Sequence, residues 1–258
     1  AVTAGLCMQT LGLPGWVATI AAIVIACICG AINGLLITKL KLSAFVATLS
    51  TQFIYKGLVT GISKGFPYTQ LDPTYSSFGR ADILGIPLIT LAGIAILIVV
   101  WYFFKYTMTG RKLLATGGNI RAASMAAVNT DRMIFIANTL SGFFAGIAAV
   151  WSVSMNSIAQ PTTGSDWMLY SFAVSVIGGT GLAGGVICPL GLAIAGFMIV
   201  VIKNGLVLIQ ANTYLEQTYL GLILLAACSV GSISGMINSA RRRHQFRAEQ
   251  AAKIKSQS

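Results

Sequence analysis

The chain has 258 residues, of which 56% are apolar and only 9% are charged. Soluble domains carry charge on about a quarter of their residues, so this composition excludes an ordinary soluble protein. A net charge of +11 would suggest nucleic acid in a soluble protein. Here the basic residues cluster between or after apolar runs, which is typical of the cytoplasmic side of a membrane protein, so no nucleic-acid partner is expected. We predict an all-α, polytopic transmembrane helix bundle.

Seven apolar segments are long enough, or nearly long enough, to be predicted as membrane helices. In chain order they are Trp16–Ile37, Ala44–Ile62, Ile86–Phe104, Met133–Met155, Leu169–Gly178, Ile187–Ile209 and Glu216–Ile237. The fifth is too short to span the bilayer if it ends at Gly178. It either continues through the glycine-rich turn that follows or is a re-entrant or broken helix.

The distribution of Lys and Arg predicts the orientation of these segments. Lys39 and Lys41 place the first turn inside, and the strongly basic segment 105–132 and the basic tail 239–258 are also inside. The charge-balanced loop 63–85 and the loop 156–168 are then outside. This alternation places residue 1 outside, so a native cytoplasmic N-terminus would require an odd number of additional spans. Three would bring the total to ten.

Residues 110–132 form a polar, basic insert between apolar segments. Gly110, Gly117 and Gly118 favour turns, and Asn119 is a good N-cap for a helix over residues 120–127. Alanines at 122, 123, 126 and 127 would give this helix a low, smooth surface. Such a helix either docks into a groove of another protein or lies at the membrane interface.

The sequence GRKLLATGGNIRAASMAAVNT, residues 110–130, resembles the cytoplasmic coupling segment of ATP-binding-cassette (ABC) importer permeases of the ribose and simple-sugar type, in the branched-chain amino acid/ribose permease superfamily. Residues 32–58, 159–164 and 176–185 are similar to further signatures of that family, in the same order. Two positions depart from the pattern: Ile120 replaces a residue that is often acidic, and Ala127 replaces the usual glycine. The matching positions are Gly110, Arg111, Ala115, Gly117, Gly118, Asn119, Ala122, Ala123, Val128 and Asn129.

The resemblance implies that residues 1–258 form one permease domain of a sugar importer in the bacterial inner membrane, with a cytoplasmic C-terminus. Separate ABC ATPase subunits would bind ATP and Mg, because this chain has no G-x-x-x-x-G-K-[ST] loop and is expected to bind no cofactor itself. A periplasmic or lipid-anchored solute-binding protein would deliver the sugar, and a second permease, identical or paralogous, would complete the pathway among the membrane lipids. The ATPase would be coupled through Gly110, Arg111, Gly117, Gly118, Asn119, Ala122, Ala123 and Asn129.

Polar and aromatic side chains within the predicted spans are candidates for the substrate pathway, because polar groups at membrane depth are costly. These candidates are Asn33, Gln52, Phe53, Lys203 and Asn204. The alternative for each is ordinary helix packing or interhelical hydrogen bonding. Gln160 and Pro161 begin an outer loop that would meet the binding protein. The single histidine, His244, lies in the basic tail, and the sequence offers no constellation for catalysis or for a metal site.

Three pairs of glycines are spaced four residues apart, as in closely packed membrane helices: Gly30 and Gly34, Gly142 and Gly146, and Gly231 and Gly235. The stretch GGTGLAGG, 178–185, lacks the lysine of a phosphate-binding loop, so it is predicted to be a tight turn or a broken helix, and contact with the ATPase stays open.

The cargo also stays open, since nucleosides, furanone autoinducers and branched-chain amino acids use related permeases. An ion-coupled secondary transporter is disfavoured because the spans carry almost no acidic residues.

Overall fold

A computed structural model describes residues 1–83, 85–181, 184–208, 218–219 and 221–222. The chain divides into two compact units. The first comprises residues 1–168 together with 183–187, and the second comprises 169–182 together with 188–258. Each unit is described by itself.

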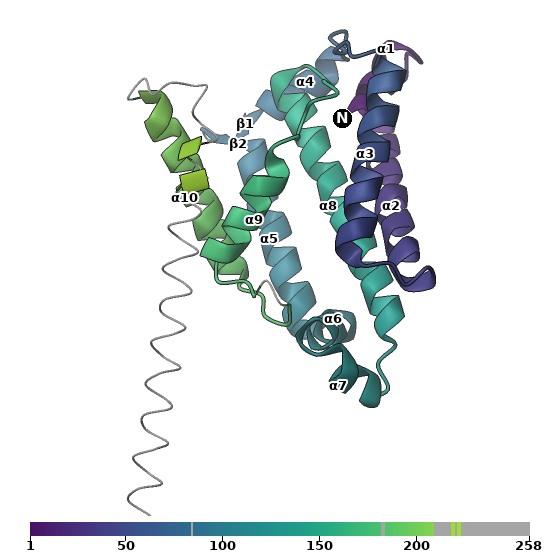
Figure 1. Ribbon diagram of the computed structural model, residues 1–258. Helices are drawn as coiled ribbons and strands as arrows, with labels where there is room; N and C mark the ends of the chain where they lie inside the picture. Colours follow the sequence, from purple (N-terminus) through teal and green to yellow (C-terminus); the bar gives the residue numbers. More distant parts are fainter. Residues whose placement is uncertain (84, 182–183, 209–217, 220, 223–258) are drawn as a thin grey trace, which may run out of the picture. The chain divides into compact units, whose positions relative to one another are not determined.

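The first unit is a bundle of four long helices with short elements at both ends (Figure 1). The long helices are α2 (Gly15–Lys39), α3 (Ala44–Ser63), α5 (Leu88–Tyr106) and α8 (Thr130–Asn156). At one end lie α1 (Val2–Gln9), α4 (Pro73–Arg80) and the short antiparallel hairpin of β1 (Asp82–Ile83) and β2 (Ile86–Pro87). At the other end lie α6 (Met108–Gly118) and α7 (Ile120–Met125). The second unit contains most of α9 (Trp167–Ile177) and all of α10 (Pro189–Leu208).

Among the described residues, the four helices α2, α5, α8 and α10 are long and apolar enough to cross a membrane, which confirms four of the predicted spans. Helix α3 has its predicted position and 20 residues, but polar residues such as Gln52 and Lys56 make it less apolar than these four. Helix α9 ends at Ile177 after 11 residues, too short to span a bilayer. The seventh predicted span, 216–237, falls almost wholly outside the described residues, as does the tail 239–258.

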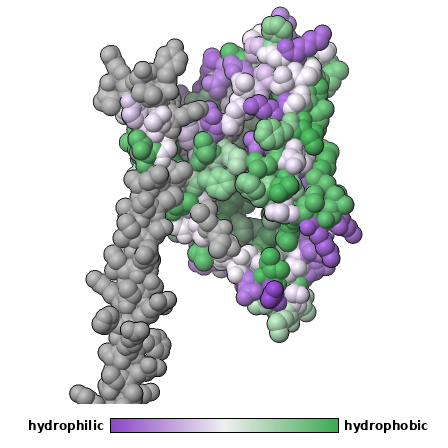
Figure 2. Space-filling model, in the orientation of Figure 1, coloured by the Kyte–Doolittle hydropathy of each residue, from purple (hydrophilic) through white to green (hydrophobic). Residues whose placement is uncertain are grey.

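The exposed surface of the first unit divides into an apolar middle and hydrophilic ends. Figure 2 shows apolar side chains over the middle of the bundle on the side of α2 and α3, and hydrophilic side chains at both ends. Phe53 on α3 is 73% exposed and Ile54 beside it is 57% exposed. Large apolar side chains exposed in such a band are typical of a surface that contacts lipid or another membrane protein.

Helices α2 and α8 pack through the glycines that the sequence singled out. A Cβ added at Gly30 would lie 3.1 Å from the Cα of Gly142, and one added at Gly146 would lie 3.1 Å from the Cα of Ile23. Gly34 approaches Phe135 in the same way, at 3.0 Å from its Cα. Close backbone approach supplies the packing energy in lipid, where no hydrophobic force drives helices together. Two of the three predicted glycine pairs are thus helix contacts, and the third, Gly231 and Gly235, lies outside the described residues.

The end of the bundle opposite α6 and α7 is held by a small core. It is formed by Ala4, Cys7, Met8, Ala18, Ala22, Tyr75, Val150, Val153 and Ala159. The Tyr75 hydroxyl donates to the carbonyl of Val150 at 2.9 Å, and the Ser154 hydroxyl donates to the carbonyl of Tyr75 at 2.6 Å. These bonds fix α4 on α8. The interpretation of residues 63–85 as a plain loop is therefore wrong over residues 73–80.

Candidate functional site

Helix α6 folds back onto the last turn of α5, with a sharp bend at Thr107. The Thr107 hydroxyl accepts a hydrogen bond from the Gly110 amide at 3.0 Å, which caps α6, and donates to the carbonyl of Phe103 at 2.6 Å. A Cβ added at Gly110 would lie 2.8 Å from the Cα of Phe104. Gly110 is therefore required for close approach within a helix. The predicted turns at Gly110 and Gly117–Gly118 are wrong, because all three glycines belong to α6 and the chain turns at Asn119.

Asn119 is the N-cap of α7, as predicted. Its backbone is extended, and its side-chain oxygen accepts from the Ala122 amide at 3.0 Å. The helix ends at Met125, two residues before the predicted end. The chain then enters the left-handed region at Ala127, where φ is 58°. A glycine adopts this conformation without steric cost and an alanine does not, which explains why the resembling motif carries glycine here.

The second asparagine of the motif starts the next helix. The Asn129 side-chain oxygen accepts from the Arg132 amide at 3.0 Å, which caps α8. The two asparagines, ten residues apart, thus define both ends of a compact elbow. Each satisfies a backbone donor that a helix start leaves unpaired. The elbow that joins α6 to α8 is therefore held by local hydrogen bonds.

The predicted coupling residues divide into an inward and an outward set. Gly110 and Ala123 are buried, so they act through packing. The exposed set consists of Arg111, Gly117, Gly118, Asn119, Ala122 and Asn129. The sequence interpretation missed the largest apolar contribution to this surface, since Met125 is 89% exposed and Ile120 is 54% exposed. A signal was available in the sequence: residues five positions apart, such as Ile120 and Met125, do not share one face of a helix, so a single buried face cannot cover both.

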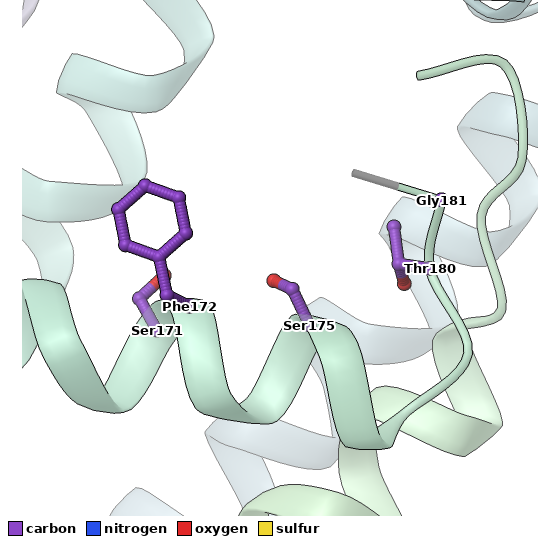
Figure 3. A pocket seen from close by; sticks show the side chains of 5 residues that line it. All are labelled: Ser171, Phe172, Ser175, Thr180 and Gly181. Carbon is purple, nitrogen blue, oxygen red and sulfur yellow. The ribbon is translucent and has the colours of Figure 1, made fainter. Parts of the chain in front are cut away.

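A pocket lies in the second unit between α9 and the turn that follows it (Figure 3). Its volume is about 220 Å³, and it is lined by Ser171, Phe172, Ser175, Thr180 and Gly181. Ser171 and Ser175 are four residues apart on α9, so they share one face of the helix. The Thr180 hydroxyl oxygen is buried and has no hydrogen-bond partner among the described residues. This hydroxyl-lined pocket offers donors and acceptors beside one aromatic ring.

Lys203 of α10 is held against α9. Its Nζ lies 3.3 Å from the Tyr170 hydroxyl and 4.5 Å from the centre of the Tyr170 ring. Asn204, its neighbour, is exposed. Lys203 thus makes a cation–π contact, which combines charge with an aromatic face. Tyr170 immediately precedes the pocket residue Ser171 in the sequence, but neighbouring residues on a helix point in different directions, and Lys203 is not among the residues that line the pocket.

The other predicted pathway residues lie in the first unit. Asn33 is half-buried on α2, and its side-chain oxygen has no hydrogen-bond partner among the described residues. Gln52 and Phe53 are exposed on α3. A further contact joins the two helices, since the Tyr55 hydroxyl donates to the carbonyl of Cys29 at 3.2 Å. The five predicted pathway residues are therefore divided between the two units.

Gln160 and Pro161, predicted to meet a binding protein, follow a bridge between two loops. The Tyr68 amide donates to the Ala159 carbonyl at 2.9 Å, and the Ala159 amide returns a bond to the Tyr68 carbonyl at 3.0 Å. Gln160 is exposed and Pro161 is half-buried. The bridge joins the loop before α4 to the loop after α8, so a partner that binds one of these loops is attached to both.

Comparison with known proteins places this geometry in a family. The family model described as "Branched-chain amino acid transport system / permease component" matches residues 1–228. The ribose import permease protein of Bacillus subtilis (strain 168) is 34% identical over 197 residues, which cover 76% of this chain and 61% of that protein. The ribose import permease protein of Escherichia coli (strain K12) is 31% identical over 219 residues, covering 83% of this chain and 68% of that one.

A third relative is named for a different sugar. The L-arabinose transport system permease protein of Escherichia coli (strain K12) is 34% identical over 197 residues, which cover 76% of this chain and 60% of that protein. The chain thus spans about three fifths to two thirds of the length of these relatives. No solved structure matches the chain. The family match over residues 1–228, together with four helices apolar enough to cross a membrane, identifies the chain as a multi-pass membrane protein that belongs to the branched-chain amino acid transport system permease family.

Proposed function

We propose that this chain is the transmembrane subunit of an ABC importer, and that it forms the pathway for a monosaccharide. Separate ATPase subunits hydrolyse ATP with Mg, and a periplasmic or lipid-anchored solute-binding protein delivers the sugar. The chain pairs with a second permease, identical or paralogous, in the bacterial inner membrane. Its C-terminus is cytoplasmic. The observation that carries this proposal is the capped elbow of α6 and α7 with its exposed side chains.

The build of the elbow suits a docking surface for an ATPase. Met125 and Ile120 expose apolar surface, and Arg121 beside them is also exposed. An exposed bulky apolar side chain beside an arginine is typical of an anchor in a protein interface. The caps at Asn119 and Asn129 hold this anchor on a rigid segment, so little conformational entropy is lost when a partner binds.

The proposed cargo rests on the names of the relatives and on the chemistry of the pocket in the second unit. Two relatives are named for ribose and one for L-arabinose. The hydroxyls of Ser171 and Ser175 can exchange hydrogen bonds with a sugar, and the Phe172 ring can cover its apolar face. Nucleosides, furanone autoinducers and branched-chain amino acids are the alternative cargoes within the same fold.

The test is ATP-driven uptake in proteoliposomes. The complete permease is reconstituted with its ATPase and binding protein, and uptake of radiolabelled ribose, L-arabinose, allose, adenosine and leucine is measured with and without ATP. We expect ATP-dependent uptake of one of the sugars. Uptake of adenosine or leucine alone would change the cargo, and uptake driven by an ion gradient without ATP would refute the importer.

A matched pair of variants tests the docking surface. Met125→Ala removes an anchor that is 89% exposed on α7, and Leu11→Ala removes an apolar side chain that is 59% exposed at the opposite end of the bundle. We expect Met125→Ala to lower the amount of ATPase recovered with the purified permease by about tenfold, as for an interface hot spot. Leu11→Ala should leave it unchanged. Equal recovery with both variants would show that the ATPase binds elsewhere.

A further inference from the structure

Two glycines far along the chain touch the end of α6. A Cβ added at Gly117 would lie 2.9 Å from the amide nitrogen of Gly185, and one added at Gly184 would lie 2.5 Å from the carbonyl oxygen of Gly117. At Gly185 the added atom would lie 2.6 Å from the Cα of Gly118. Backbones approach this closely only where no side chain intervenes. The coupling segment is therefore in direct backbone contact with Gly184 and Gly185, the last two residues of the stretch GGTGLAGG.

The beginning of the same stretch belongs to the second unit and packs on α10 there. A Cβ added at Gly178 would lie 2.8 Å from the amide nitrogen of Leu192, in the first turn of α10. Thr180 and Gly181, between the two tied ends, form one wall of the hydroxyl-lined pocket. The chain reaches Gly184 from α9 and continues from Gly185 into α10. A displacement of α6 that carries Gly184 and Gly185 with it therefore acts on both helices and on the pocket wall.

We propose that Gly117, Gly184 and Gly185 are positioning residues that pass the movement of the coupling segment to α9 and α10. This inference rests on the proposed function, since it supposes that an ATPase moves α6 and α7. It gives a function to the stretch GGTGLAGG, 178–185, which lacks the lysine of a phosphate-binding loop. The relay needs close backbone approach at Gly117 and Gly185, and it does not involve Gly57 of α3 or Gly179.

Two matched pairs of variants separate contact from other effects of the substitutions. Gly117→Ala and Gly57→Ala each add a methyl group at an exposed glycine within a helix. The added atom lies 2.9 Å from the amide nitrogen of Gly185 at position 117, whereas Gly57 of α3 has open space within 4 Å. Gly185→Ala and Gly179→Ala impose the same left-handed strain, at φ 83° and 75°. Gly179 has open space within 4 Å, whereas Gly185 meets the Cα of Gly118.

The measurement is the number of sugar molecules imported per ATP hydrolysed, in proteoliposomes that hold the complete permease with its ATPase and binding protein. We expect Gly117→Ala and Gly185→Ala to lower this ratio by fivefold or more while the ATPase is still recovered with the permease and still hydrolyses ATP. Gly57→Ala and Gly179→Ala should stay within twofold of the wild type. A merely structural role would lower transport and ATPase recovery together and leave the ratio unchanged.

The outcomes are distinct. ATP-driven uptake by the wild type, with equal ratios for the contact variants and their controls, overturns the relay and leaves the proposed function standing. Wild-type uptake that does not depend on ATP refutes the proposed function and the relay together. Where one contact variant cannot be recovered in the assembly, the other pair decides.

Discussion

The N-cap of α7 allows a quantitative prediction. Asn119→Ala removes the side-chain oxygen that accepts from the Ala122 amide at 3.0 Å. Loss of such a cap costs about 1 kcal/mol. Helix α7 has only six residues, so it has little other internal stabilisation. Since 1.4 kcal/mol is a factor of ten, the open form of α7 should become about fivefold more populated.

Hydrogen exchange measures this change. The permease is placed in nanodiscs, labelled with deuterium for milliseconds, and digested for mass spectrometry. In Asn119→Ala, amides of residues 120–125 should exchange about fivefold faster, while those of α6 keep their wild-type rate. Asn119→Asp is the control, because a carboxylate also accepts the Ala122 amide and favours a helix N-terminus. Unchanged exchange in Asn119→Ala, or equally fast exchange in Asn119→Asp, would refute the argument that this cap holds the elbow.

Three further predictions concern stability. Ala127→Gly should raise the free energy of unfolding by about 1 kcal/mol, because φ is 58° at this position; a lower melting temperature in detergent would contradict this. Gly142→Ala should destabilise by about 1–3 kcal/mol, because the added methyl would lie 3.1 Å from the Cα of Gly30. Gly93→Ala, in a helix with open space around it, should not destabilise, so equal melting temperatures for the two variants would refute the packing argument. Burial raises the pKa of Tyr75 from 10.0 to about 12, so its protonated form is favoured in the folded state. This contribution is complete below pH 10 and is lost as the pH rises to about 12. The fall in melting temperature over that range should be shallower in Tyr75→Phe, and identical curves would contradict the assignment.

Much of the bundle follows from local features of the sequence. Apolar runs of sufficient length indicated α2, α5, α8 and α10 because a membrane span requires such length. The spacing of Gly30 and Gly34, and of Gly142 and Gly146, indicated close helix packing, although not which helices would meet. Asn119 was predictable as a cap because its side chain competes for backbone donors in one particular local geometry.

Other features depend on contacts between distant parts of the chain. Helix α4 was missed because its position is fixed by Tyr75 and Ser154, on different helices. Helix α6 was missed because Gly110 and Gly117 suggested turns. Both lie within the helix, where the absence of a side chain lets another part of the backbone approach closely. The contact of Gly117 with Gly185 joins residues that are far apart in sequence, and neither stretch alone carries a sign of the other.

Helix α8 has a mechanical consequence. Its 27 residues begin directly after the Asn129 cap and end beyond Ser154, whose hydroxyl is bonded to α4. At 1.5 Å per residue the helix is a stiff rod of about 40 Å, braced along its length by α2. A tilt of about 5° at the α7 end would displace the opposite end by about 3.5 Å, by the geometry of such a rod. A small tilt of α8 at one end of the bundle therefore produces a displacement about as wide as a water molecule at the other end.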